Sequence, residues 1–185
     1  MPPSIPEFDH NSVLPPHTGD PAQGSTEMSP YRCTTVELCQ RFGTSPERRA
    51  ILRKYLEFRR RLREAGISNG FQWLDGSFVE DIEAQENRPP KDLDLVTFFW
   101  GYDLDQVAQA KIAFPAFGGR KIAKKDYFLD HFSVDADVHP LITIEFTRYY
   151  GLLFSHNREG VWKGMLRIDL HTESDDVVAL DSLAK

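Results

Sequence analysis

The sequence predicts an α+β domain in which helices flank a small mixed β-sheet. Short apolar or alternating segments, typical of strands, are interleaved with longer segments whose apolar residues recur at helical spacing. The length of 185 residues suits one domain with a modest core. A composition of 41% hydrophobic and 27% charged residues is ordinary for a globular protein. We therefore expect one compact unit rather than a fibrous or disordered chain.

The N-terminal region is expected to be an arm followed by a short helix. Residues 1–30 contain seven of the twelve prolines, so no regular element is expected there. A few apolar side chains favour an extended arm laid on the core over a mobile tail. Thr35–Phe42 is predicted to be a short helix that ends at Gly43.

A long basic helix is expected next. Thr44 and Glu47 fit a capping box, and Pro46 suits the first helical turn. Residues 48–63 carry eight basic side chains against one acid. This face is either simply solvated or a phosphate-contacting surface for a nucleic acid such as tRNA.

The remaining elements follow in chain order. The predicted strands are Phe71–Leu74, Leu93–Trp100, Phe132–Val138 and Met165–Leu170. The predicted helical segments are Ser77–Ala84, Leu104–Phe114 and Leu141–Phe154. A Gly-rich basic loop is expected over Pro115–Lys125, and an acidic, frayed tail beyond His171. The expected regions are an arm with a short helix (1–43), the main domain (44–172) and the tail (173–185).

Charge, cysteines and hydropathy limit the class of protein. A net charge of −6 argues against a general polyanion binder. The two cysteines match no common zinc pattern and are expected to be reduced thiols. No secretory signal is apparent, and the longest apolar stretches are too short to span a bilayer. We therefore expect a cytoplasmic protein with no membrane partner.

The most informative feature is a Gly-Ser turn followed by two aspartates. Gly76 and Ser77 follow one predicted strand, and Asp92 and Asp94 open the next. Because residues i and i+2 of a strand point to the same face, both carboxylates can bind one divalent cation. The turn offers backbone N–H groups and a hydroxyl to the phosphates that such a cation also binds.

A third carboxylate is expected from an adjacent strand. Within Phe132–Val138, Asp135 and Asp137 alternate onto the same face, and either can complete a Mg²⁺ site. This carboxylate would also lower the pKa of an attacking hydroxyl. The residues alone leave the choice between the two open.

These motifs resemble the nucleotidyltransferase superfamily, with its polymerase-β-like minimal fold: a Gly-Ser turn, then Asp-x-Asp, then a later Asp on a strand. The chain is more similar still to a small bacterial nucleotidyltransferase-like family of unsettled function. The motifs that carry this closer resemblance are Ile5-Pro6-Glu7-Phe8, Val13-Leu14-Pro15-Pro16, Asp75-Gly76-Ser77-Phe78-Val79, Asp92-Leu93-Asp94 and Lys163-Gly164-Met165-Leu166-Arg167-Ile168. This resemblance favours Asp135 as the third carboxylate.

The resemblance implies a Mg²⁺-dependent enzyme that moves a nucleoside monophosphate from a nucleoside triphosphate, such as ATP, to an acceptor hydroxyl. The acceptor would be a tRNA, a protein or a small molecule, in a toxin–antitoxin or phage-defence setting. The expected catalytic residues and metal ligands are Asp92, Asp94 and Asp135, and the expected nucleotide-binding residues are Gly76, Ser77 and Lys91. The alternative is a catalytically silent binding module that acts as an antitoxin or interaction partner.

Overall fold

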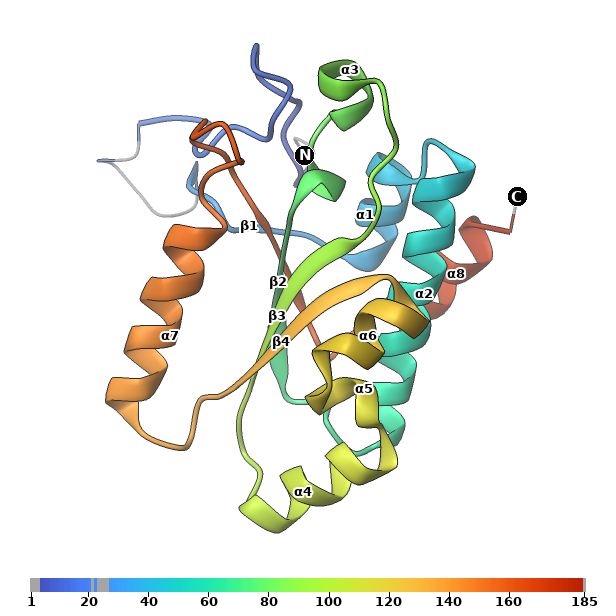
Figure 1. Cartoon of the computed structure of the whole chain (residues 1–185), viewed down its shortest axis with the longest axis vertical. Coiled ribbons are helices and arrows are strands. Elements are labelled where there is room, and N and C mark those ends of the chain that lie inside the picture. Colours follow the sequence, from blue (N-terminus) through green and yellow to red (C-terminus); the bar gives the residue numbers. More distant parts are fainter. Residues whose placement is uncertain (1–3, 21, 23–26, 185) are drawn as a thin grey trace.

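The computed structural model describes residues 4–20, 22 and 27–184. One five-stranded sheet runs through it, with strand order β1-β5-β2-β3-β4 (Figure 1). The strands are β1 (Tyr31–Arg32), β2 (Gly70–Asp75), β3 (Leu93–Phe99), β4 (Leu129–Asp135) and β5 (Leu166–Asp169). The β1–β5 and β3–β4 pairs are parallel, and β2 is antiparallel to both of its neighbours. The mixed sheet flanked by helices is therefore confirmed.

Eight α-helices lie in the described part of the chain. They are α1 (Thr35–Phe42), α2 (Pro46–Glu64), α3 (Ile82–Glu86), α4 (Leu104–Ala113), α5 (Pro115–Gly118), α6 (Arg120–Tyr127), α7 (Pro140–Leu153) and α8 (Glu173–Ser182). A 3₁₀ turn, η2 (Ser77–Val79), follows β2. None of these helices is both long and apolar enough to cross a membrane.

The two faces of the sheet are covered very unequally. Helices α1, α2, α4, α5, α6 and α8 all contribute to the main hydrophobic core on one face, with α2 across its middle. Helix α7 stands alone against the other face, where a smaller apolar cluster surrounds Tyr150 (Figure 1). Successive side chains of the central strands therefore point in turn to the main core and to the face that α7 covers.

The described part of the N-terminal arm lies on the core as expected, since Ile5, Val13 and Leu14 are buried. The segment includes β1, which pairs with β5 at the edge of the sheet. The arm also touches the region after β2, because Val13 forms an isolated bridge with Glu80. The expected arm and main domain thus share one sheet.

Three expected elements differ in the structure. The predicted loop over Pro115–Lys125 is helical in α5 and α6, because Ala116, Phe117 and Ala123 are buried in the main core. Strand β4 begins and ends three residues earlier than predicted. The apolar alternation runs on past Asp135, but the chain turns there before α7.

Residues 172–184 are also ordered, contrary to expectation. They include α8, which packs on α1 and α2. Asp176 of α8 is buried and pairs with Arg59 of α2, with both Asp176 oxygens 3.0 Å from Arg59 Nε. An acidic segment is helical here because it supplies the carboxylate that a buried guanidinium needs.

The basic helix α2 is mostly a structural element. Arg48 and Arg59 are buried, and both lie on the side of α2 that faces the protein. Arg48 donates to Glu83 and to the carbonyls of Phe78 and Glu80, so α2 anchors the segment that follows β2. These two cations are therefore unavailable to a nucleic acid.

Candidate functional site

Three aspartates form a row across the centre of the sheet. The register of β2 against β3 places Asp75 opposite Asp94, and the register of β3 against β4 places Asp94 opposite Asp130. Residues directly opposite each other on paired strands share a face, and Asp92 shares that face as the residue two positions before Asp94. The face is the one that α7 covers only in part. Four carboxylates from three strands are thereby brought into one region.

The Gly-Ser turn lies directly against this row. Gly76 has a φ of +82° and a ψ of −173°, a conformation that is essentially restricted to glycine. A Cβ at this position would lie 2.0 Å from Asp94 Oδ2, so no side chain fits without moving the carboxylate. Ser77 then opens η2. The turn therefore brings the backbone of Gly76 close to Asp94, and Ser77 lines the same cleft as Asp94.

A buried lysine, Lys163, holds the Gly-Ser turn in place. Lys163 is 2% exposed, and its Nζ lies 2.9 Å from Asp75 Oδ1, 2.6 Å from Glu80 Oε1 and 3.2 Å from the carbonyl oxygen of Gly76. Burial alone would lower the pKa of Lys163, but the Asp75 and Glu80 carboxylates raise it. The lysine stays charged and ties both ends of the turn together.

Two cations pair with the outer carboxylates of the row. Lys124 Nζ lies 2.8 Å from Asp92 Oδ2 and 3.7 Å from Asp130 Oδ2. Arg120 donates to both oxygens of Asp130, with Nη2 2.7 Å from Oδ2. Both cations come from α6, which packs beside β4. As the side chains stand, no three His, Cys, Asp or Glu residues within the described ranges are arranged to hold a metal ion.

The electrostatics separate the carboxylates into two kinds. Burial, followed by the charges of Asp92, Asp75 and Asp130, raises the pKa of Asp94 to about 7. Burial also raises the pKa of Asp75 to about 6, although Lys163 opposes the shift. The hydrogen bond from Arg120 holds the pKa of Asp130 below its ordinary value. Asp94, in the middle of the row, thus lies half-buried among three other carboxylates, whereas Asp75 and Asp130 are paired with Lys163 and Arg120.

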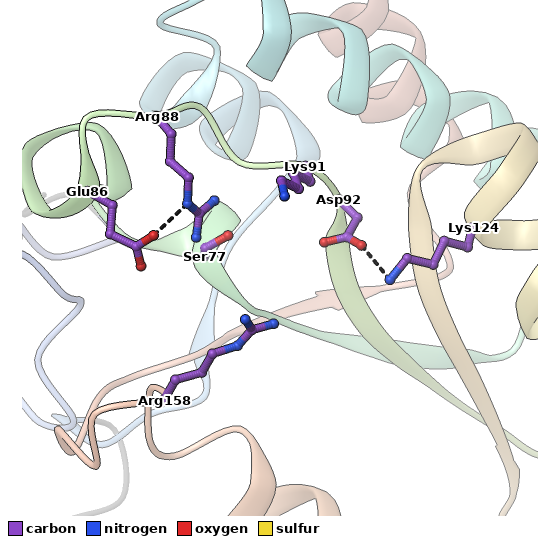
Figure 2. Close-up of a pocket in the computed structure, with 7 residues that line it drawn as sticks. All are labelled: Ser77, Glu86, Arg88, Lys91, Asp92, Lys124 and Arg158. Carbon is purple, nitrogen blue, oxygen red and sulfur yellow. Dashed lines mark hydrogen bonds and ion pairs between the residues drawn. The ribbon is translucent and has the colours of Figure 1, made fainter.

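A cationic pocket opens beside the turn (Figure 2). It has a volume of about 440 Å³ and is lined by Ser77, Glu86, Arg88, Lys91, Asp92, Lys124 and Arg158. In Figure 2, Arg88 and Arg158 reach in from two different segments, with Ser77 between them. Four basic side chains against two acidic ones make this a suitable environment for a polyanion.

A larger cleft of about 700 Å³ continues from this pocket over the aspartate row to α7. Its far wall is apolar and includes Phe132, Tyr149, Leu152 and Phe154. A concave site with one charged end and one apolar wall suits a ligand that has a phosphate chain and a flat or apolar part.

The structure brings together five of the six residues expected at the site. Asp94 is the second residue of β3 and Asp92 directly precedes the strand. Gly76 and Ser77 line the cleft, and Lys91 lines the adjoining pocket.

The sixth residue, Asp135, was a wrong prediction. It pairs with Phe99 at the other end of β3, five residues beyond Asp94, which is roughly 17 Å along a strand. Asp135 also follows Asp130 by five residues, and an odd separation on a strand places two side chains on opposite faces. Asp130, and not Asp135, therefore shares the face of its register partner Asp94. The alternative, Asp137, lies beyond β4 and accepts a hydrogen bond from the Gly101 amide.

The residue that takes this position is Asp130, which the sequence analysis missed. A usable signal was present, because the strand after a βα connection runs parallel to the strand before it. Parallel strands begin at the same edge of a sheet, and Asp94 lies at the beginning of β3. The matching carboxylate should therefore lie at the beginning of the later strand, as Asp130 does, and not at its end.

Comparison with known proteins adds a family but no activity. Residues 6–169 match the model of a family described as a family of unknown function, DUF6932. No curated protein and no solved structure gave a significant match. Because the match extends over most of the sequence, the chain belongs to this family of unknown function, DUF6932.

Proposed function

We propose that the protein is a Mg²⁺-dependent nucleotidyltransferase that moves a nucleoside monophosphate from a nucleoside triphosphate to an acceptor hydroxyl and releases pyrophosphate. One observation carries the proposal. Asp94 and Asp130 are register partners on adjacent parallel strands, with Asp92 on the same face and the Gly76 turn in contact with Asp94. A carboxylate cluster beside a small, glycine-dependent turn is an arrangement suited to phosphoryl chemistry.

The donor set fits Mg²⁺ in its chemistry. Carboxylate oxygens on rigid strands are the ligands that Mg²⁺ prefers, and Asp92, Asp94 and Asp130 would hold it. Bound there, Mg²⁺ would offset the negative charge on the phosphoryl oxygens. The raised pKa of Asp94, which follows from burial and from the neighbouring carboxylates, supports this assignment, since a bound cation would offset both.

The chain's own residues would bind and orient the substrates. The Ser77 hydroxyl and the backbone N–H groups of its turn would hold the phosphates, and Arg88, Lys91 and Arg158 would neutralise them. Asp130 would help to hold the cation, and a cation bound there would lower the pKa of the acceptor hydroxyl.

The apolar wall of the cleft would serve the nucleobase or the acceptor. Phe132, Tyr149 and Leu152 offer flat and aliphatic surface next to the aspartate row. Such a wall also excludes water from the phosphates. The acceptor class in this proposal, a tRNA, a protein or a small molecule, is open to direct assay.

A second candidate function is a catalytically silent binding module, an antitoxin or interaction partner. The specific observation in its favour is that Lys124 and Arg120 already pair with Asp92 and Asp130. Such pairing would also satisfy these carboxylates in a chain that never binds a cation.

One experiment separates the two candidates. The protein is incubated with Mg²⁺, α-labelled nucleoside triphosphates, and either total tRNA or candidate partner proteins. We expect label transfer by the wild type and a loss of at least about 100-fold in Asp94→Asn and Asp130→Asn. Asp135→Asn is the matched control and should retain transfer, because this carboxylate lies at the far end of β4. Transfer that survives both Asp94→Asn and Asp130→Asn contradicts the proposed site, and binding of a partner without any transfer by the wild type favours the silent module.

A further inference from the structure

Helix α7 exposes more apolar surface than a helix of a monomeric protein is expected to show. Its exposed apolar side chains are between 41% and 61% accessible: Leu141, Ile142, Ile144, Phe146, Tyr149, Leu152 and Leu153. Tyr150 is the one buried residue of this helix. A helix that is apolar on most sides is normally covered, and contiguous exposed apolar surface marks an interaction site.

The outward side of α7 is defined by the contacts of Tyr150. The Tyr150 ring packs against Phe132 and Phe98 of the sheet, with ring centroids 5.5 and 6.4 Å apart. At 3.6 residues per turn, the side of the helix opposite Tyr150 carries Leu141, Glu145, Arg148 and Leu152, flanked by Ile144 and Tyr149. These six residues form the outer face of α7. Leu141, Ile144 and Leu152 are each at least 60% exposed there.

The chemical character of the outer face is symmetric about the midpoint of the helix. The midpoint of α7 (Pro140–Leu153) falls between Phe146 and Thr147. Rotation about that midpoint exchanges Leu141 with Leu152, Ile144 with Tyr149, and Glu145 with Arg148. Apolar positions exchange with apolar positions, and the one acid exchanges with the one base.

We propose that the outer face of α7 binds the outer face of α7 in a second copy of this chain, antiparallel and across a two-fold axis. In that arrangement Glu145 lies opposite the partner subunit's Arg148, and Arg148 lies opposite the partner subunit's Glu145. A two-fold contact must be self-complementary, and this face meets that condition in both charge and hydrophobicity. An unrelated partner would not require an acid and a base placed symmetrically about the midpoint of the helix.

The charged pair supports this choice of occupant. Within one chain, Arg148 Nη2 lies 2.8 Å from Glu145 Oε2, and the two side chains are 61% and 56% exposed. They can therefore exchange partners between copies without leaving a buried charge unpaired. A 14-residue helix is about 21 Å long, so the contact is small and the dimer should dissociate on dilution. Because Tyr149 and Leu152 also line the cleft, the second copy would border the candidate site.

Sedimentation equilibrium of the full chain between about 1 and about 100 µM tests the proposal. We expect the wild type to approach twice its chain mass of 21.2 kDa at the upper concentration. Glu145→Arg places four bases at the contact, and Arg148→Glu places four acids there. Each single variant should therefore raise the dissociation constant at least about tenfold. An equimolar mixture of the two single variants should dimerise again, because each base then meets an acid of the other chain. The doubly substituted chain should dimerise as well.

Glu64→Arg is the matched control, since Glu64 is also an exposed helical acid that pairs with arginines one turn away, but on α2. It should dimerise like the wild type. Far-UV circular dichroism of each variant confirms that the fold is retained. Three outcomes would overturn the proposal: a wild type that stays monomeric at about 100 µM, single variants that dimerise as tightly as the wild type, or a mixture that fails to dimerise. A wild-type monomer that binds lipid vesicles or another protein through α7 would likewise reject the second copy as the occupant.

Discussion

The two faces of the sheet treat polar groups in opposite ways. On the face covered by α2, the buried polar side chains satisfy one another. Gln72 accepts from Tyr55 at 2.8 Å and donates to Thr97 at 3.0 Å, and Thr97 lies 3.0 Å from His131 Nε2. On the face covered by α7, Asp75, Asp94 and Asp130 stand side by side, and an ionised carboxylate can only accept hydrogen bonds, so the three cannot satisfy one another.

This difference separates stability from function. The face covered by α2 is the packed face. A closed network of donors and acceptors rigidifies it and favours a single arrangement of the strands. A row of like charges costs folding free energy and is retained where it has another use, such as binding a cation or a reacting group. The packed face thus keeps the strands in register. These strands place the carboxylates on the face covered by α7, the open face.

The largest effect should come from removing the buried cation of the packed face. Arg59 is fully buried and donates to Asp176, to Gln72 at 2.8 Å and to the Asp169 carbonyl at 2.9 Å. Arg59→Ala leaves Asp176 buried without its main partner, so we expect the free energy of unfolding to fall by about 3–5 kcal/mol. Urea denaturation measures the change.

Arg60→Ala is the control for this substitution. The Arg60 side chain is 56% exposed and pairs with Glu64 on the surface of α2, so its loss should change the free energy of unfolding by less than about 0.5 kcal/mol. If Arg59→Ala and Arg60→Ala have similar effects, the packed face does not depend on its polar network.

The packed face is also where local sequence patterns predict the structure well. The helix Thr35–Phe42, the long basic helix and the strand that begins at Leu93 follow from caps and from apolar periodicity, and all are present. The N-cap of the long helix is Ser45, whose hydroxyl accepts from the Arg48 amide, so the capping box expected at Thr44 was wrong by one residue. Capping and periodicity are local properties, so a window of ten to twenty residues contains the information that they need.

The errors come from contacts between distant segments. The acidic segment that forms α8 is ordered by Arg59, 117 residues earlier in the chain, and no local signal marks that partnership. Likewise, the identity of the third carboxylate depends on the register of β4 against β3. The predicted strand starts three residues too late and so leaves Asp130 out. Asp135 was expected in its place, although it lies at the wrong end of the strand and on the wrong face.

A smaller effect, opposite in sign, is expected on the open face. The pKa of Asp94 is about 7 in the folded chain against an ordinary value of 3.8, so the folded state holds a proton that the unfolded state has released between these pH values. Stability contributed by this proton is complete below pH 3.8 and is lost as the pH rises to about 7. Asn does not titrate, so Asp94→Asn keeps the stability that the wild type loses when Asp94 is deprotonated. The variant should gain on the order of 2–4 kcal/mol over the wild type between about pH 4 and pH 8.

Urea denaturation of both proteins at about pH 5 and about pH 8 measures this difference. A gap between variant and wild type that does not widen with pH would show that the row of carboxylates is not strained. Added Mg²⁺ should stabilise the wild type at pH 8 and leave Asp94→Asn unchanged, because only a ligand of the folded state shifts unfolding. Stabilisation of both proteins to the same extent would place the cation elsewhere.

The smallest effect compares two glycines that both have a positive φ but have different neighbours. Gly66 and Gly76 have φ values of +95° and +82°, so alanine is strained at both. An added Cβ at Gly66 meets nothing within 4 Å, whereas at Gly76 it would lie 2.0 Å from Asp94 Oδ2. We expect Gly66→Ala to cost about 1 kcal/mol and Gly76→Ala about 1–3 kcal/mol in urea denaturation. Binding of a fluorescent nucleoside triphosphate should weaken at least about tenfold in Gly76→Ala alone, since only there does the added methyl displace a carboxylate of the row. Equal binding by the two variants would mean that the close approach of the turn to Asp94 has no part in ligand binding, and the open face would then have to be explained without the turn.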